Sequence, residues 1–153
     1  MTKILMVCLG NICRSPLAEG ILKSKVDNAK VFVDSAGTAG YHIGSLPDPR
    51  SIKVAEKHGI DLTNQRCRKF THSDFSNFDT IYVMDKNNYY DVMAHARSNE
   101  EKAKVKLLLN DVDTHISEVP DPYYGGAEGF EYVFTLLDSA CEEIAKNQID
   151  ATR

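Results

Sequence analysis

The feature that most constrains the fold is the alternation of short apolar runs with helical patterns along the whole chain. Four short apolar runs, three of them rich in Val or Ile, are predicted to be buried strands: residues 4–7, 31–33, 81–84 and 105–109. Continuous apolar runs of this length, without polar alternation, are typical of parallel strands that are covered on both faces. The sequence therefore favours a parallel sheet.

Apolar residues at helical spacing fill the gaps between these runs. They occur at residues 17–22, at 52–55 before Gly59, more weakly at 86–97, and most clearly at 130–144. Strand and helix thus alternate from end to end, which predicts one doubly wound α/β domain over residues 1–153 with right-handed crossovers. In such sheets ligands bind beyond the carboxyl ends of the strands, near a switch in strand order, so the loops after the strands are the first candidates for a site.

Length, charge and cysteine content exclude several classes of protein. The 153 residues suit one domain, and 18 basic against 22 acidic residues give a net charge of -4, which argues against nucleic acid as a partner. No apolar run approaches the roughly 18 to 20 residues of a membrane helix, and the first run is too short for a signal peptide, so we expect a cytoplasmic protein without a membrane partner. The four cysteines need not form a disulfide framework, and the five histidines are too dispersed for a zinc motif, so neither metal nor cofactor is expected.

The most informative loop follows the first predicted strand and reads Cys-Leu-Gly-Asn-Ile-Cys-Arg-Ser-Pro over residues 8–16. Five residues between Cys8 and Arg14 allow the backbone to curl around one tetrahedral anion, and Gly10 is expected to supply a positive φ. Ser15 is predicted to be the N-cap of the first helix and Pro16 its first residue, which would point the helix amino end at the anion. The loop is therefore predicted to bind phosphate.

Two side chains of this loop are suited to phosphoryl chemistry. Arg14 presents a planar fork that can bind two phosphoryl oxygens at once. Cys8 would lie among amide dipoles, a helix terminus and the guanidinium, all of which favour the thiolate, and the Ser15 hydroxyl could donate to that sulfur. A buried structural cysteine before a turn is the alternative, but the preceding strand, the internal glycine and the Ser-Pro helix start favour a nucleophile.

Two Asp-Pro pairs compete as the general acid that phosphate ester cleavage requires. Asp48-Pro49 precedes an amphipathic run and suits an N-cap followed by the first helical residue. Asp121-Pro122 precedes Tyr-Tyr-Gly-Gly, which is typical of a loop, and follows the fourth predicted strand at the edge of the sheet where the Cys8 loop lies. One carboxyl group can protonate the leaving group and then activate water, and Asp121 is predicted to have that role.

With these motifs in place, the sequence resembles the low-molecular-weight protein tyrosine phosphatases. The matching segments are residues 7–16, 34–38, 47–50 and 121–125. The resemblance implies a four-stranded parallel sheet and a metal-free, two-step hydrolysis of aryl phosphates. The substrate would be a phosphotyrosine protein or peptide, the product inorganic phosphate, and the general acid would lie in the Asp-Pro-Tyr-Tyr segment.

The resemblance also implies roles for residues around the loop. Asn11 and Ser35 would belong to a hydrogen-bond network that supports the loop, although a histidine of some relatives has no match here because Asn64 and Gln65 occupy the region. The predicted phosphate-binding loop consists, besides Cys8 and Arg14, of Leu9, Gly10, Asn11, Ile12, Cys13 and Ser15. An aromatic rim would consist of Tyr41 and Tyr124 with Leu9 between them, with Tyr123 equally compatible with a rim role and with covering the core edge.

The other three cysteines, Cys13, Cys67 and Cys141, occur in different sequence contexts. The resemblance implies a reversible Cys8–Cys13 disulfide under peroxide, although Cys13 could equally be a helix-start residue packed in the core. Cys141 falls on the apolar stripe of the last helix and is predicted to be core, and no role is predicted for Cys67.

Three other functions fit parts of the pattern. Thioredoxin-coupled arsenate reductases share the loop but need downstream resolving cysteines, and no cysteine lies between Cys67 and Cys141. Some bacterial relatives dephosphorylate arginine and have Thr where this chain has Ile12, a bulkier apolar residue that favours an aryl ester. A phosphate-binding module without chemistry would need neither Cys8 nor Asp121.

Overall fold

The structure, a computed structural model, describes all residues except 111, 113–115, 124–125 and 152–153. Its elements in chain order are β1 (Thr2–Cys8), α1 (Arg14–Lys25), β2 (Val31–Gly37), α2 (Pro49–Lys57), α3 (Asp74–Asn77), β3 (Thr80–Val83), α4 (Lys86–Met93), α5 (Asn99–Ala103), β4 (Val105–Leu107) and α6 (Ala127–Ala151). The four strands form one parallel sheet in the order β2-β1-β3-β4, which confirms the predicted fold class.

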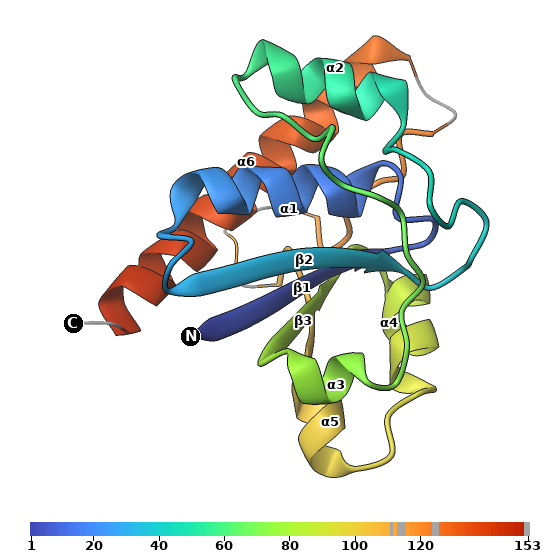
Figure 1. The fold of residues 1–153 in the computed structure, drawn as a ribbon, viewed down its shortest axis with the longest axis vertical. Coiled ribbons are helices and arrows are strands. Elements are labelled where there is room, and N and C mark those ends of the chain that lie inside the picture. Colours follow the sequence, from blue (N-terminus) through green and yellow to red (C-terminus); the bar gives the residue numbers. More distant parts are fainter. Residues whose placement is uncertain (111, 113–115, 124–125, 152–153) are drawn as a thin grey trace.

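Helices cover both faces of the sheet, with α1, α2 and α6 on one side and α3, α4 and α5 on the other (Figure 1). Strand β1 shows why its whole sequence is apolar. Ile4 and Met6 pack into the core cluster beneath α1 and α6, whereas Leu5 and Val7 pack into the cluster on the opposite face. Successive side chains of a strand point to opposite faces, so a strand between two helical layers must be apolar at every position.

The strand order places the switch point at β1. The chain leaves β1 through α1 to reach β2 on one side, and later returns to β3 on the other side of β1. The loops that follow β1 and β3 are therefore neighbours at the carboxyl edge of the sheet, which lies at the right in Figure 1, away from both termini. This is the position at which open α/β sheets bind ligands.

Two predicted helix boundaries differ from the structure. The helix predicted over 86–97 is shorter in the structure, because α4 ends at Met93, and the next helix, α5, begins only after the N-cap Ser98. The prediction that Ser15 caps α1 is wrong, because α1 begins at Arg14 and its N-cap position is Cys13, which makes no side-chain capping bond. The Ser15 hydroxyl instead contacts the Cys8 sulfur, which explains why it does not cap the helix.

Asp48 has the structural role predicted for it. It is the N-cap of α2, where its carboxylate accepts a hydrogen bond from the Arg50 amide at 2.8 Å, and Pro49 is the first residue of the helix. The helix ends at Lys57, just before Gly59, whose φ of 78° ends the helical path. No helix in the described part of the chain is both long and apolar enough to cross a membrane.

Candidate active site

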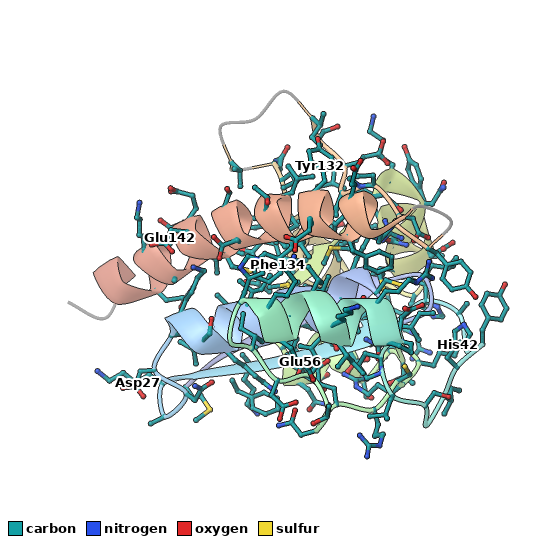
Figure 2. All side chains as sticks on the ribbon, turned by 90° about the horizontal axis from the view of Figure 1, so that it is seen from above. Asp27, His42, Glu56, Tyr132, Phe134 and Glu142 are labelled. Atoms are coloured by element: carbon teal, nitrogen blue, oxygen red, sulfur yellow. The ribbon has the colours of Figure 1, made fainter. Side chains whose placement is uncertain are left out.

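A cavity of about 340 Å³ opens at the carboxyl edge of the sheet and collects residues from three loops, which join β1 to α1, β2 to α2 and β4 to α6. Its lining consists of Cys8, Leu9, Gly10, Ile12, Cys13, Arg14, Tyr41, His42, Asp121 and Tyr123. Figure 2 shows His42 at this end of the molecule, opposite the turn that holds Asp27. The predicted nucleophile, arginine and acid, which are up to 113 positions apart in the sequence, therefore line one cavity.

The backbone of the phosphate loop differs from the prediction at one residue. Asn11, not Gly10, takes the left-handed conformation, with a φ of 57°. Asparagine tolerates this region better than most residues, and the fixed side chain of Asn11 maintains it. Gly10 provides space, because a Cβ at this position would lie 3.3 Å from Cδ2 of His42.

Asn11 is the centre of a buried hydrogen-bond network. Its Oδ1 accepts a hydrogen bond from the backbone N–H of Arg68 at 2.9 Å, which fixes the orientation of the amide. Its Nδ2 then donates to Oγ of Ser15 at 2.9 Å and to Oγ of Ser35 at 3.0 Å. The network implied for Asn11 and Ser35 is thus present in the structure.

The network limits where the Ser15 proton can point. Because Ser15 Oγ accepts a hydrogen bond from Asn11, its own proton is free to donate elsewhere. The Cys8 sulfur lies 3.0 Å from this oxygen, whereas the carbonyl oxygen of Ala36 lies 3.5 Å away. The hydroxyl can therefore donate to either of these two acceptors, and the Cys8 sulfur is the nearer one.

On its other side the network ends at Glu19, a residue that the sequence analysis did not identify. Ser35 donates to Oε1 of Glu19 at 2.7 Å, and Lys23 donates to Oε2 at 2.6 Å. Burial raises the pKa of Glu19, although the hydrogen bonds from Lys23 and Ser35 oppose that rise. Gln65, in the region where relatives have a histidine, donates to the Pro16 carbonyl at 3.1 Å and does not contact Asn11 in the structure.

Arg14 is buried and held by two groups opposite the loop. Its Nη1 donates to Oδ2 of Asp85 at 2.7 Å and to the carbonyl oxygen of Val119 at 2.9 Å. Burial disfavours the charged guanidinium, but Cys8 and Asp85 outweigh this effect and raise the pKa of Arg14. Nε and Nη2 have no hydrogen-bond acceptor among the residues that the structure describes, so they can bind an anion.

Asp85 is a site residue that the sequence analysis missed. It lies two residues after the end of β3 and caps α4, where its Oδ1 accepts from the Asn88 amide at 2.8 Å, which leaves Oδ2 for Arg14. The sequence did indicate this position as a candidate, because Asp85 follows the predicted strand 81–84 and the site was expected in the loops after the strands. Its helix-capping role could have been predicted, but its pairing with Arg14 required the strand order.

The carboxyl group of Asp121 lies at the mouth of the cavity. Its Oδ1 accepts a hydrogen bond from the Tyr123 amide at 3.0 Å, and its Oδ2 lies 3.8 Å from Nη2 of Arg14. Its side chain is 45% exposed, so water can reach it. Asp48, the competing aspartate, instead caps α2 and forms an ion pair with Arg50.

Exposed apolar and aromatic side chains surround the cavity. Leu9, Tyr41 and Tyr123 all line it, and Tyr41 is the most exposed of them at 74%. Tyr124, the fourth predicted rim residue, lies outside the described residues. His42 is an additional lining residue that no sequence motif indicated.

The remaining cysteines lie in apolar or buried surroundings that keep them protonated. Burial, together with the nearby charges of Asp48 and Cys8, raises the pKa of Cys13 to about 12. Cys141 is fully buried and its thiol donates to the Ala18 carbonyl at 3.6 Å, as expected of a core residue, and burial raises its pKa. All four cysteines are free thiols, and within the described residues no group of His, Cys, Asp and Glu side chains could hold a metal ion.

Cys67 supports the strained residue of the phosphate loop. Burial, then the charge of Cys8, raises its pKa to about 11, so the thiol is protonated at neutral pH. Its sulfur donates to the carbonyl oxygen of Asn11 at 2.8 Å, next to the Arg68 amide that binds the Asn11 side chain. Residues 67 and 68 thus hold both the backbone and the side chain of Asn11.

Replacing Cys67 with alanine should weaken this support. Because the Asn11 carbonyl would lose a buried donor, we expect a loss of about 1 kcal/mol in the free energy of unfolding and a several-fold lower kcat. Cys67→Ser, which retains a donor, should recover most of the kcat. Urea unfolding and steady-state kinetics on both variants test this, and equal kcat values for Cys67→Ala and the wild type would contradict it.

A known protein family matches this chain over nearly its whole length. The family model "Low molecular weight phosphotyrosine protein phosphatase" matches residues 3–153. The chain is 42% identical over 156 residues to the low molecular weight phosphotyrosine protein phosphatase of Schizosaccharomyces pombe, covering 96% of this chain and 99% of that protein.

Solved structures agree with this match. The protein tyrosine phosphatase of Entamoeba histolytica, crystallised with Hepes in its active site, superposes with a TM-score of 0.92 at 39% identity, and both chains are covered completely. YfkJ from Bacillus subtilis superposes with a TM-score of 0.90 at 34% identity, covering 100% of this chain and 98% of that one. The chain belongs to the low molecular weight phosphotyrosine protein phosphatase family and is thus a hydrolase of the protein-tyrosine-phosphatase class.

Proposed function

We propose that this chain hydrolyses phosphotyrosine in proteins or peptides through a phosphocysteine on Cys8 and releases inorganic phosphate. The observation that carries the proposal is the shared cavity of Cys8, Arg14 and Asp121. It combines a nucleophile, a cationic group with free donors, and a carboxyl group that water can reach. A module that only bound phosphate would need the arginine but neither of the other two groups.

In the first step the Cys8 thiolate attacks phosphorus in line with the tyrosyl oxygen, and the S–P bond forms as the P–O bond breaks. Nε and Nη2 of Arg14 bind two equatorial oxygens, while Asp85 and Val119 hold the guanidinium from behind. Backbone amides of the loop bind the remaining negative charge. Stabilisation of the transferring phosphoryl group by these donors should supply most of the rate.

Asp121 supplies the proton that the leaving tyrosyl oxygen needs. The same carboxylate then accepts a proton from the water that attacks the phosphocysteine, which releases phosphate and restores the acid. The Ser15 hydroxyl lies 3.0 Å from the Cys8 sulfur, so it can donate to the thiolate and stabilise it as it leaves phosphorus. A proton transfer of this kind contributes roughly 10²–10⁴-fold to the rate.

The walls of the cavity support an aromatic ester. Leu9, Tyr41 and Tyr123 provide apolar and aromatic surface at its mouth, and Ile12 adds an apolar side chain within the lining. A phenyl ring can pack against such walls while its phosphate lies in the loop. The role of Tyr124 in this rim stays a prediction from the sequence.

The proposal is tested by phosphate release from a phosphotyrosine peptide and a matched phosphoarginine peptide, with EDTA present, using the wild type and Cys8→Ser. We expect release from phosphotyrosine that is absent in Cys8→Ser. Release from phosphoarginine alone would assign a different substrate to the same site. No release from either peptide would overturn the proposed function.

Cys13 is proposed to protect the nucleophile from peroxide. Hydrogen peroxide oxidises the Cys8 thiolate to a sulfenic acid and releases hydroxide, after which the Cys13 sulfur attacks the Cys8 sulfur and expels water to form a disulfide. A reducing thiol would restore both cysteines by exchange. Both residues line the same cavity, which supports the pairing.

The raised pKa of Cys13 predicts slow closure of this disulfide at neutral pH. With a pKa of about 12, the attacking thiolate is scarce, and its fraction rises about tenfold per pH unit below that value. The rate of disulfide closure after a peroxide pulse, followed by alkylation and mass spectrometry, should rise accordingly with pH. In Cys13→Ser, prolonged exposure to peroxide should oxidise the Cys8 sulfenic acid further to sulfinic acid, which dithiothreitol does not reduce. Full recovery of that variant after an exposure from which the wild type also recovers would contradict the protective role.

A further inference from the structure

One face of α2 carries three basic residues beside the active site. Arg50, Lys53 and Lys57 lie at helical spacings of three and four residues, so they share a face with Val54. Glu56 lies about 100° around the helix from Lys57. This basic face is notable in a chain whose net charge is -4.

A groove of about 350 Å³ runs along this face. Its lining consists of Arg50, Lys53, Val54, Lys57, Phe130 and Glu131. Val54 and Phe130 are nearly fully buried and form an apolar floor, while the charged residues form the rim. Helices α2 and α6, which supply the two sides, lie next to each other in Figure 2.

Arg50 forms the wall between this groove and the active-site cavity. Its guanidinium carbon lies 5.3 Å from the ring centre of Tyr123 and 4.7 Å from that of Phe130. Tyr123 lines the active-site cavity, whereas Phe130 lines the groove. A peptide whose phosphotyrosine occupies the cavity can therefore continue across Arg50 into the groove.

The three cations are not equally available to a ligand. Arg50 is paired with Asp48 at 3.0 Å, and Lys57 with Glu131 at 2.6 Å, an anion that His58 also faces at 3.3 Å. Lys53 is exposed and has no ion pair among the residues that the structure describes. The groove thus has one available ammonium group between two cations that are already held in place.

We propose that this groove is a subsite for a carboxylate side chain of the protein substrate, close in sequence to the phosphotyrosine. The inference rests on the proposed function and names part of its substrate preference. The apolar floor accommodates the methylene groups of a glutamate, and the Lys53 ammonium pairs with its carboxylate between the Arg50–Asp48 and Lys57–Glu131 ion pairs. A basic peptide residue would instead be repelled by the Lys53 ammonium and be disfavoured.

The test uses a phosphotyrosine peptide that is otherwise neutral, with one glutamate moved through the positions on either side of the phosphotyrosine. The same peptides with glutamine serve as the reference. For the wild type, we expect glutamate to raise kcat/KM about twofold to fivefold over glutamine at one or two positions, the range of a single exposed ion pair. Lysine at those positions should lower kcat/KM.

Charge reversal at Lys53 connects this preference to the groove. Lys53→Glu should abolish or invert the glutamate preference, and raised salt should weaken it in the wild type. Lys102→Glu is the matched control, because Lys102 is an exposed lysine on α5, at the far end of the molecule from α2 in Figure 1. Both variants should hydrolyse a small aryl phosphate at the wild-type rate.

The outcomes separate this inference from the proposed function. Equal glutamate-to-glutamine ratios in the wild type and Lys53→Glu at every position, with phosphotyrosine still hydrolysed, would overturn the subsite and leave the function intact. The same holds if Lys102→Glu changes the preference as much as Lys53→Glu does. Absence of hydrolysis of all phosphotyrosine peptides by the wild type would overturn both.

Discussion

Replacing Cys8 with serine is expected to reduce phosphate release from aryl phosphates by at least about 10⁴-fold. A serine hydroxyl is a much weaker nucleophile than a cysteine sulfur, so the variant should form no covalent phosphoenzyme even though the phosphate-binding donors remain. Steady-state kinetics measures the loss. Rapid quenching of the wild type with a labelled substrate should trap phosphate on Cys8, and the variant should trap none.

Binding of phosphate provides the control for this variant. Because Arg14 and the loop amides are the groups proposed to hold the anion, Cys8→Ser should still be stabilised by inorganic phosphate, seen as a rise in the thermal midpoint like that of the wild type. A variant that lost both turnover and this rise would have a disrupted loop. Turnover within tenfold of the wild type would show that Cys8 is not the nucleophile.

Replacing Asp121 with asparagine is expected to lower kcat by roughly 10²–10⁴-fold on phenyl phosphates with poor leaving groups. Asparagine retains the oxygen that accepts from the Tyr123 amide, so the loop should stay in place while the transferable proton is lost. The loss should shrink for leaving groups that need little protonation, such as nitrophenol. A series of substituted phenyl phosphates measures this dependence.

The second Asp-Pro pair offers a matched control. Asp48→Asn makes the same substitution before a proline, and asparagine is as good an N-cap as aspartate, so α2 should remain intact and kcat should change little. The asparagine there also retains an acceptor for the Arg50 amide. Equal losses of kcat in Asp121→Asn and Asp48→Asn would show that Asp121 is not the general acid.

The sequence alone determined the fold class and identified the loop between the first strand and the first helix as the candidate site. Short apolar runs between amphipathic segments required strands covered on both faces, and the structure has the four predicted strands in a parallel sheet. These features are local, because hydrophobic periodicity and the residues of a loop depend only on neighbouring positions in the sequence. The same holds for Asp48 and Pro49, whose helix-start pattern was correctly interpreted.

Only the tertiary structure decided how the site is held together. Asp85 reaches Arg14 from 71 positions away, and residues 67 and 68 hold Asn11 from more than 50 positions away, because the strand order brings β1 and β3 together and the chain after α2 returns to the loop. The positive φ of Asn11 and the orientation of the Ser15 hydroxyl follow from those contacts, so local preferences predicted Gly10 and a helix cap instead. A residue's chemistry is set by its type, but its partners are set by packing between distant segments, which no local pattern records.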